Sequence, residues 1–188
     1  SGNPLPNTKV RVVDADFNDL PNRSVGEIAL QSDCMLTEYF NRPDANESAI
    51  KNGWYLTGDY GYIADGELYV SGRKKDLIIV GGKNVYPQDL ESLASEVPGV
   101  HAGRTVAFGM YDEEEGTEEV VIIAEADSTD PLEQEAIADA IRKHVTKSSA
   151  IALRHVKVVD DKWIIKTSSG KTARSANKEK FLKELAVH

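Results

Sequence analysis

Apolar and polar residues alternate in short blocks over residues 1–72, and this pattern predicts strands joined by turns. Three strands are expected, over residues 9–13, 26–31 and 66–71. A turn is expected at residues 16–22 and a short helix at residues 39–48, where proline, aspartate and asparagine gather. Short strands at this spacing predict a small β-barrel-like unit.

The pattern changes after residue 76, where apolar residues recur at helical spacing between strand-like blocks. Strands are expected at residues 77–80, 105–109, 119–126 and 154–159. Helices are expected at residues 87–97, 130–147 and 175–185. The middle helix has an apolar stripe formed by Leu132, Ala136, Ile137, Ala140, Ile141 and Val145. The predicted fold class is therefore α+β, with a small β-barrel-like subdomain followed by a small sheet covered by helices.

Composition and charge exclude several classes of function. Apolar residues make up 40% of the chain and charged residues 28%, which is typical of a soluble globular protein. A net charge of −9 argues against general binding to nucleic acid. No apolar run approaches the roughly 20 residues that cross a bilayer, so no membrane span is expected. The single cysteine, Cys34, excludes an internal disulfide and suits a reducing, cytoplasmic location.

The charges are unevenly distributed along the chain. Residues 112–139 carry twelve acidic residues and no lysine or arginine, which is typical of a solvated face. Residues 162–183 carry seven basic residues against one acid, and they surround Lys171, where a substrate bearing phosphate would bind. The four histidines show no metal-ligand spacing, so no metal site is expected.

Three segments hold the candidate chemistry, and each also has a plain structural interpretation as turns and solvated charge. They are Gly-Trp-Tyr-Leu-Thr-Gly-Asp at residues 53–59, Gly-Arg-Lys-Lys-Asp-Leu-Ile-Ile-Val-Gly-Gly-Lys-Asn-Val-Tyr-Pro at residues 72–87, and Lys-Thr-Ser-Ser-Gly-Lys-Thr-Ala-Arg at residues 166–174. In this order they resemble the adenylate-forming superfamily of acyl-CoA synthetases, fatty acyl-AMP ligases, peptide-synthetase adenylation domains and luciferases. The resemblance covers nearly the whole chain, but only the C-terminal part of such an enzyme.

The resemblance implies a division of the chain into two parts. Residues 1–72 would be the last β-rich subdomain of a large N-terminal adenylation domain, whose phosphate loop and acyl pocket lie further upstream in the family. Residues 73–188 would be the mobile C-terminal domain, with the hinge near Lys75. Lys75 could instead be a surface charge in a turn. Gly81 and Gly82 form a tight turn that, in relatives using coenzyme A, lines the tunnel for the pantetheine arm.

Asp59 and Arg73 are the candidate nucleotide-binding residues. A carboxylate can accept both hydroxyl groups of a ribose, and the preceding glycine lets the backbone approach closely. A guanidinium group suits paired oxygens of a ribose or a phosphate. In the family the residues at these positions contact ATP, so the resemblance implies the same roles for Asp59 and Arg73.

Lys171 is the candidate catalytic residue. It ends a loop of small hydroxyl and glycine residues, and it could also be a solvated lysine before a helix. In the family this lysine contacts the substrate carboxylate and the α-phosphate. A cation placed between two anions would offset their repulsion in the transition state. Many relatives carry a proline two residues before the threonine, where this chain has Ile165.

The resemblance implies an ATP- and magnesium-dependent ligase that forms acyl-AMP from a fatty acid. The segment at residues 86–91 and the loop at residues 167–171 look most like fatty acyl-AMP ligases, which pass the acyl group to the phosphopantetheine thiol of an acyl carrier protein. An acyl-CoA synthetase, with CoA as acceptor, is the alternative. A non-catalytic module that docks a carrier protein is a third possibility. We expect the chain alone to be inactive, because ATP and magnesium would be bound mainly by the upstream part.

Overall fold

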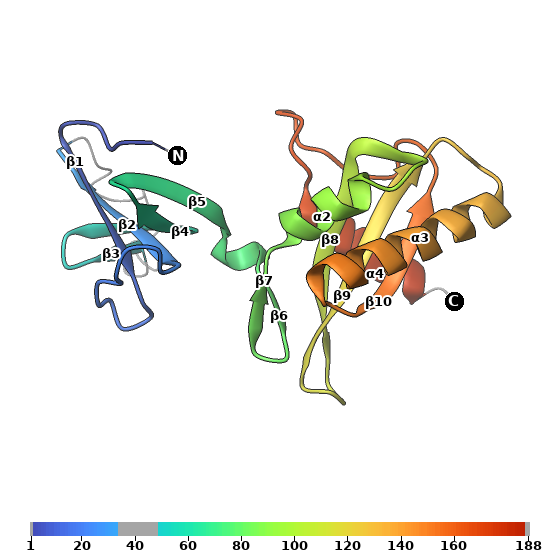
Figure 1. Ribbon diagram of the computed structural model, residues 1–188, viewed down its shortest axis with the longest axis horizontal. Helices are drawn as coiled ribbons and strands as arrows, with labels where there is room; N and C mark the ends of the chain where they lie inside the picture. Colours follow the sequence, from blue (N-terminus) through green and yellow to red (C-terminus); the bar gives the residue numbers. More distant parts are fainter. Residues whose placement is uncertain (1, 34–48, 187–188) are drawn as a thin grey trace. The chain divides into compact units, whose positions relative to one another are not determined.

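The computed structural model describes residues 2–33 and 49–186, and these divide into two compact units, Ser1–Lys75 and Asp76–His188 (Figure 1). The short helix expected at residues 39–48 and Cys34 lie outside the described residues. None of the helices in the described part is both long and apolar enough to cross a membrane.

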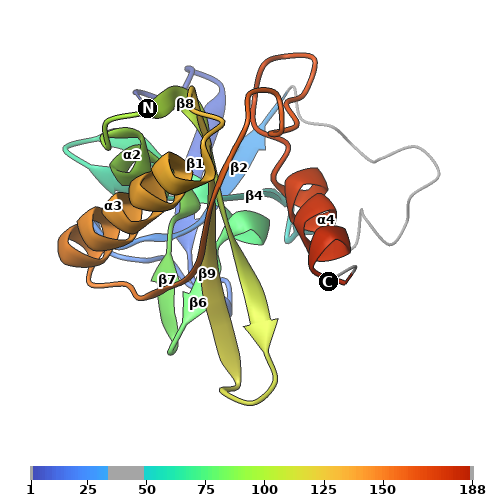
Figure 2. The same cartoon turned by 90° about the vertical axis from the view of Figure 1, so that its right-hand side faces the viewer.

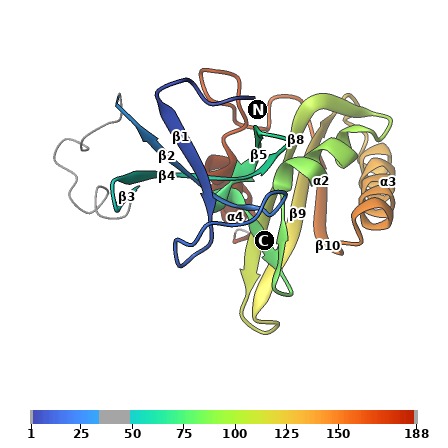
Figure 3. The same cartoon turned by 60° about the vertical axis from the view of Figure 1, so that its left-hand side comes forward.

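The first unit is an antiparallel sheet of five strands (Figure 3). They are β1 (Thr8–Val13), β2 (Gly26–Ser32), β3 (Ile50–Lys51), β4 (Trp54–Ala64) and β5 (Glu67–Arg73). The order is β1-β2-β4-β3, and β5 also pairs with β4. The three strands expected from the sequence are present. The pattern of apolar and polar residues did not indicate β4. Apolar and polar residues alternate poorly along this strand, because its pairing with the neighbouring strands is interrupted twice.

The two interruptions in β4 are β-bulges. Opposite β2, the pairs Glu27–Tyr60 and Ala29–Leu56 leave residues 57–59 facing a single residue. Gly58 has a φ of 70°, which a glycine adopts without the steric cost of a Cβ. Opposite β5, the register shifts after the pair Tyr60–Gly72. Bulges bend a strand and redirect its side chains, so β4 curls the sheet and presents residues 57–59 to one side.

The second unit begins with the hairpin of β6 (Ile78–Val80) and β7 (Lys83–Val85). Its central sheet has three strands, β8 (Val100–Asp112), β9 (Thr117–Ala126) and β10 (Leu153–Val159), in the order β10-β9-β8. Strands β8 and β9 are antiparallel, whereas β9 and β10 are parallel. A parallel pair needs a crossover, and α3 (Pro131–Ser149) provides it.

Helices cover both faces of this sheet (Figure 2). Helices α2 (Pro87–Ser95) and α3 pack on one face with Ala107, Val120, Ile122 and Ala124 of the strands. Helix α4 (Arg174–Leu185) packs on the other face, where Phe181 meets Val106, Phe108, Val121 and Ile123. Successive strand residues point to opposite faces, so β9 contributes to both cores. Each fully buried large aliphatic side chain contributes roughly 1.5–3 kcal/mol. The α+β class predicted from the sequence is confirmed.

The apolar stripe of α3 differs from the expected one. Its buried residues are Ala138, Ile141 and Val145, and Leu132 is 75% exposed. Asp130 caps the helix by accepting a hydrogen bond from the Leu132 backbone N–H, at 3.1 Å. Leu132 therefore belongs to the first turn of the helix, outside the run of residues that packs on the sheet.

Candidate functional site

The structure pairs Asp59 and Arg73, which are fourteen residues apart in the sequence, as direct partners on strands β4 and β5. Arg73 Nε lies 3.4 Å from Asp59 Oδ1. The backbone N–H of Asp59 donates to Thr57 Oγ1 at 3.1 Å, and that hydroxyl donates to the Ile28 carbonyl at 3.0 Å. The bulge at residues 57–59 is thus held to β2, and it fixes where the Asp59 carboxylate points.

An open pocket of about 420 Å³ lies beside this pair, within the first unit. It is lined by Tyr55, Thr57, Gly58, Asp59, Arg73, Lys74 and Lys75. One carboxylate therefore faces three cationic side chains. This composition suits a ligand that carries both hydroxyl groups and negative charge.

Lys74 and Lys75 are adjacent but have different surroundings. Lys74 Nζ lies 2.7 Å from Glu27 Oε2, whose side chain is only 12% exposed. The hydrogen bond to Glu27 is the main cause that raises the pKa of Lys74, and partial burial opposes it. Lys75 is exposed and makes no ion pair within the described part of the chain. Of the two lysine side chains, only that of the candidate hinge residue, Lys75, is thus without an ion pair to a described residue.

Gly81 and Gly82 form the two-residue turn of the hairpin between β6 and β7. Their φ values are 54° and 77°, the left-handed conformation that such turns require. A Cβ at either position would meet no atom of the described residues within 4 Å. The turn is open, and the Gly81 N–H donates to Thr117 Oγ1 at 2.8 Å.

Lys171 lies in a tight hydrogen-bonded turn. A β-bridge between Lys166 and Thr172 closes the base of this turn. The Thr167 N–H donates to the Lys171 carbonyl at 2.8 Å, and the Gly170 N–H donates to the Thr167 carbonyl at 2.8 Å. Lys171 itself is exposed and has no ion-pair partner among the described residues. The loop is therefore closed by its own backbone, and Lys171 lies at its base, opposite Thr167.

Asn177 and Arg174 hold the base of this turn. The sequence alone did not indicate a role for either residue. Asn177 is fully buried, and its side chain accepts from the Ile165 N–H and donates to the Ile165 and Ala173 carbonyls. Arg174 contacts Asp76 and Glu91 at 2.7 Å each and the Ala107 carbonyl at 2.8 Å. Arg174 stood in the third motif, but only the fold shows that it joins α4 to the start of the second unit.

Comparison with known proteins identifies the family. No protein-family model matches the chain. It is 34% identical over 181 residues to the acyl-CoA ligase clz12 of Cochliobolus lunatus, covering 93% of this chain and 48% of that protein. It is 31% identical over 210 aligned residues to the long-chain-fatty-acid–AMP ligase FadD32 of Mycolicibacterium smegmatis, covering 91% of this chain and 33% of that protein. The solved structure of McyG A-PCP complexed with phenylalanyl-adenylate matches with a TM-score of 0.86 at 33% identity, over 98% of this chain and 33% of that one.

This chain is a member of the adenylate-forming superfamily. The resemblance inferred from the three motifs is thereby confirmed. The chain spans between a third and a half of the length of the two curated relatives named above. Within the superfamily, the relatives include both CoA ligases and an AMP ligase.

Proposed function

We propose that this chain is the C-terminal part of an ATP-dependent ligase that converts a fatty acid to its acyl-adenylate. The observation that carries the proposal is the Asp59–Arg73 pair beside an open, cationic pocket. Arg73 meets one oxygen of the Asp59 carboxylate, Oδ1. We assign the ribose hydroxyl groups to Asp59 and the neighbouring phosphate or ribose oxygens to Arg73, because these are the partners that each group prefers.

Magnesium fits this pocket poorly on its own. The lining offers one carboxylate against three cations, whereas magnesium needs oxygen ligands and usually binds through carboxylates together with substrate phosphates. We propose that magnesium accompanies ATP and is held mainly by residues outside this chain. The ion would neutralise phosphate charge during adenylation.

We propose that Lys171 supplies charge stabilisation in the adenylation step. In that step a carboxylate oxygen attacks the α-phosphorus, a new O–P bond forms, and pyrophosphate leaves. Two anions must approach, so a preorganised cation lowers the barrier. Support for this role comes from the exposure of Lys171 and from the backbone hydrogen bonds that close its turn, which restrain the point from which the side chain extends.

We further propose that residues 1–72 and 73–188 act as two domains that change orientation about Lys75. The hinge position falls where the two compact units meet in the sequence. Reorientation would let one enzyme use Lys171 in the first half-reaction and a different surface in the second. We place the open Gly81–Gly82 turn at the tunnel of the acceptor thiol, because glycines leave room for a thin chain.

For the acceptor we propose the phosphopantetheine thiol of an acyl carrier protein. Support comes from the segment at residues 86–91 and the loop at residues 167–171, which resemble fatty acyl-AMP ligases, and from the similarity to FadD32. Coenzyme A is the second candidate, because the Cochliobolus relative is an acyl-CoA ligase.

The nucleotide site can be tested on this chain alone. We expect AMP to shift the backbone NMR signals of residues 55–59 and 73–75 with weak, millimolar affinity, and Asp59→Ala to abolish these shifts. Glu67→Ala, on the same strand as Arg73 but outside the pocket, serves as the control. Shifts that survive Asp59→Ala would contradict the assignment. The chain alone should show no ATP–pyrophosphate exchange with any fatty acid.

The acceptor is tested with the full-length enzyme. Preformed acyl-adenylate is offered together with either a phosphopantetheinylated carrier protein or CoA. We expect transfer to the carrier protein to exceed transfer to CoA, and the reverse order would select the second candidate.

A further inference from the structure

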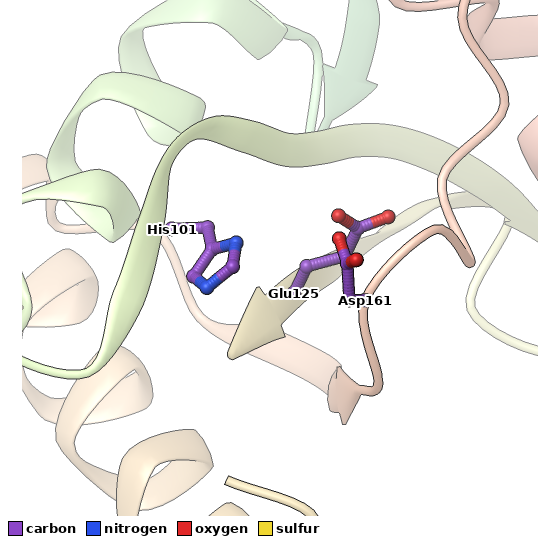
Figure 4. A group of neighbouring side chains, drawn as sticks. All are labelled: His101, Glu125 and Asp161. Atoms are coloured by element: carbon purple, nitrogen blue, oxygen red, sulfur yellow. The ribbon is translucent and has the colours of Figure 1, made fainter. Parts of the chain in front are cut away.

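A second group of polar side chains lies at one end of the three-stranded sheet, within the second unit. His101 comes from β8, Glu125 from the end of β9, and Asp161 from the segment that follows β10 (Figure 4). One ligand atom from each of these residues lies within 4.8 Å of the others. The three residues are far apart in the sequence, so no spacing motif could have indicated them.

Glu125 distinguishes this group from an ordinary acidic surface. It is fully buried, and its Oε1 atom accepts a short hydrogen bond from the Ile164 N–H at 2.6 Å. Its Oε2 atom is buried and has no hydrogen-bond partner among residues 2–33 and 49–186. The nearest cation is Arg104, whose Nε lies 3.5 Å from Oε2 and whose side chain is 32% exposed. A buried carboxylate oxygen without a hydrogen bond is costly, so this atom calls for a further positive partner.

The surrounding charge is negative. Asp127 forms an ion pair with the Nε2 atom of His101. Asp161 and Glu125 also lie near the His101 ring. Three carboxylates thus surround one imidazole, and two further cations contact the group: Arg104 lies 3.5 Å from Glu125 and Lys162 lies 3.8 Å from Asp161. A cation bound among these side chains would reduce this excess of negative charge.

We propose that His101, Glu125 and Asp161 bind a divalent transition-metal ion, with zinc as the best fit. One imidazole nitrogen and two carboxylate oxygens are ligands that zinc accepts, at about 2.0–2.2 Å. At those lengths the donor atoms lie about 3.3 Å apart, so the side chains must close by up to about 1.5 Å. The exposed fractions of the His101 and Asp161 side chains, 29% and 53%, leave both free to do so. Asp127 is close enough to His101 to orient the ring.

A metal ion bound here would restrain the segment that leads into the Lys171 turn. Glu125 already holds the Ile164 N–H, and the next residue is joined to buried Asn177 at the base of the Lys171 turn. Metal at Oε2 would fix the Glu125 side chain, and through it the strand that enters that turn. This consequence for Lys171 depends on the proposed function, whereas metal binding itself does not.

The test is a titration of the 188-residue chain with zinc chloride in chelator-free buffer at pH 7.5, followed by calorimetry. We expect saturable binding with one high-affinity site. His101→Gln and Asp161→Asn should each weaken it at least tenfold, since losing even an outer-shell partner typically costs about 10–100-fold. His144→Gln is the matched control, because His144 also pairs with a single carboxylate, Glu96, at 2.8 Å. It should bind zinc like the unmodified chain.

Two NMR observations make the test independent of folding. Zinc should shift the ring nitrogen signals of His101 and leave those of His144 unchanged, and it should slow hydrogen exchange at the Ile164 amide. The backbone spectra of the variants report whether the sheet is intact. Absence of saturable binding, or equal zinc affinity in the His101→Gln and His144→Gln variants, would overturn the proposal.

Discussion

Arg174 should be the most costly surface-accessible side chain to remove from the second unit. Its guanidinium group contacts Asp76 and Glu91, and it also donates to the Ala107 carbonyl. The three charged side chains are only 16–19% exposed. Arg174→Met keeps much of the aliphatic stem but removes every one of these hydrogen bonds. The substitution therefore leaves two carboxylates close together without their shared cation.

The expected cost follows from these contacts. A hydrogen bond to a charged group contributes about 1.5–3 kcal/mol, and solvent screening lowers that value when the group is partly exposed. Two such bonds and one carbonyl contact place the loss at about 2–4 kcal/mol of unfolding free energy. Arg174→Lys should recover only part of it, because an ammonium group cannot form the forked contacts of a guanidinium.

Native-state hydrogen exchange of the β9 amides measures this loss in the second unit alone. Protection of Val120 to Glu125 should fall by about 30- to 1000-fold, since 1.4 kcal/mol corresponds to a factor of ten. Arg154→Met is the matched control, because Arg154 is 64% exposed and lies 3.4 Å from Glu119. It should change stability by less than about 0.5 kcal/mol. A loss below about 1 kcal/mol for Arg174→Met would refute the reasoning.

Four further outcomes are expected. Lys171→Ala in the full-length enzyme should slow acyl-adenylate formation by about 10²–10³-fold, with little change in melting temperature. When the two half-reactions are assayed separately, the rate of acyl transfer should be largely unchanged. Lys75→Pro should abolish one half-reaction and spare the other, because proline fixes φ near −65°; equal loss of both would argue against a hinge. Limited proteolysis should cut at Lys74–Lys75 before any site within residues 87–160. Glu184 has a lowered pKa, mainly through its hydrogen bond with Lys157. Its stabilising effect should therefore be present above the ordinary glutamate pKa and disappear as the pH falls through the lowered value, which pH-dependent unfolding of Glu184→Gln would reveal.

Periodicity predicted most of the fold because each helix and strand of the second unit buries one regular face. The strand at residues 119–126 could be recognised from its apolar run, and Pro131 indicated the start of α3. The exposure of Leu132 could not be predicted, because the sequence does not show whether the turn of the helix that carries an apolar residue packs on the sheet. β4 was missed because its bulges break the alternation that identifies a strand.

The chemistry was readable only where it lies in local motifs. Asp59 and Arg73 stood in two recognisable segments, but their pairing depends on a register set by a bulge. Arg174 and Asn177 act across the fold, on partners as distant as Asp76. Glu125 looks like any acid near a strand end, and nothing local indicates that its carboxylate is buried. Long-range contacts of this kind arise from the packing of whole elements.

Ion pairs flank Lys75 on both sides within the 3-10 helix of residues 74–76. Lys74 pairs with Glu27 in the first unit, and Asp76 pairs with Arg174 in the second. Each of these pairs joins residues of a single unit. The proposed reorientation about Lys75 would therefore break neither pair, and its rate should depend only weakly on ionic strength.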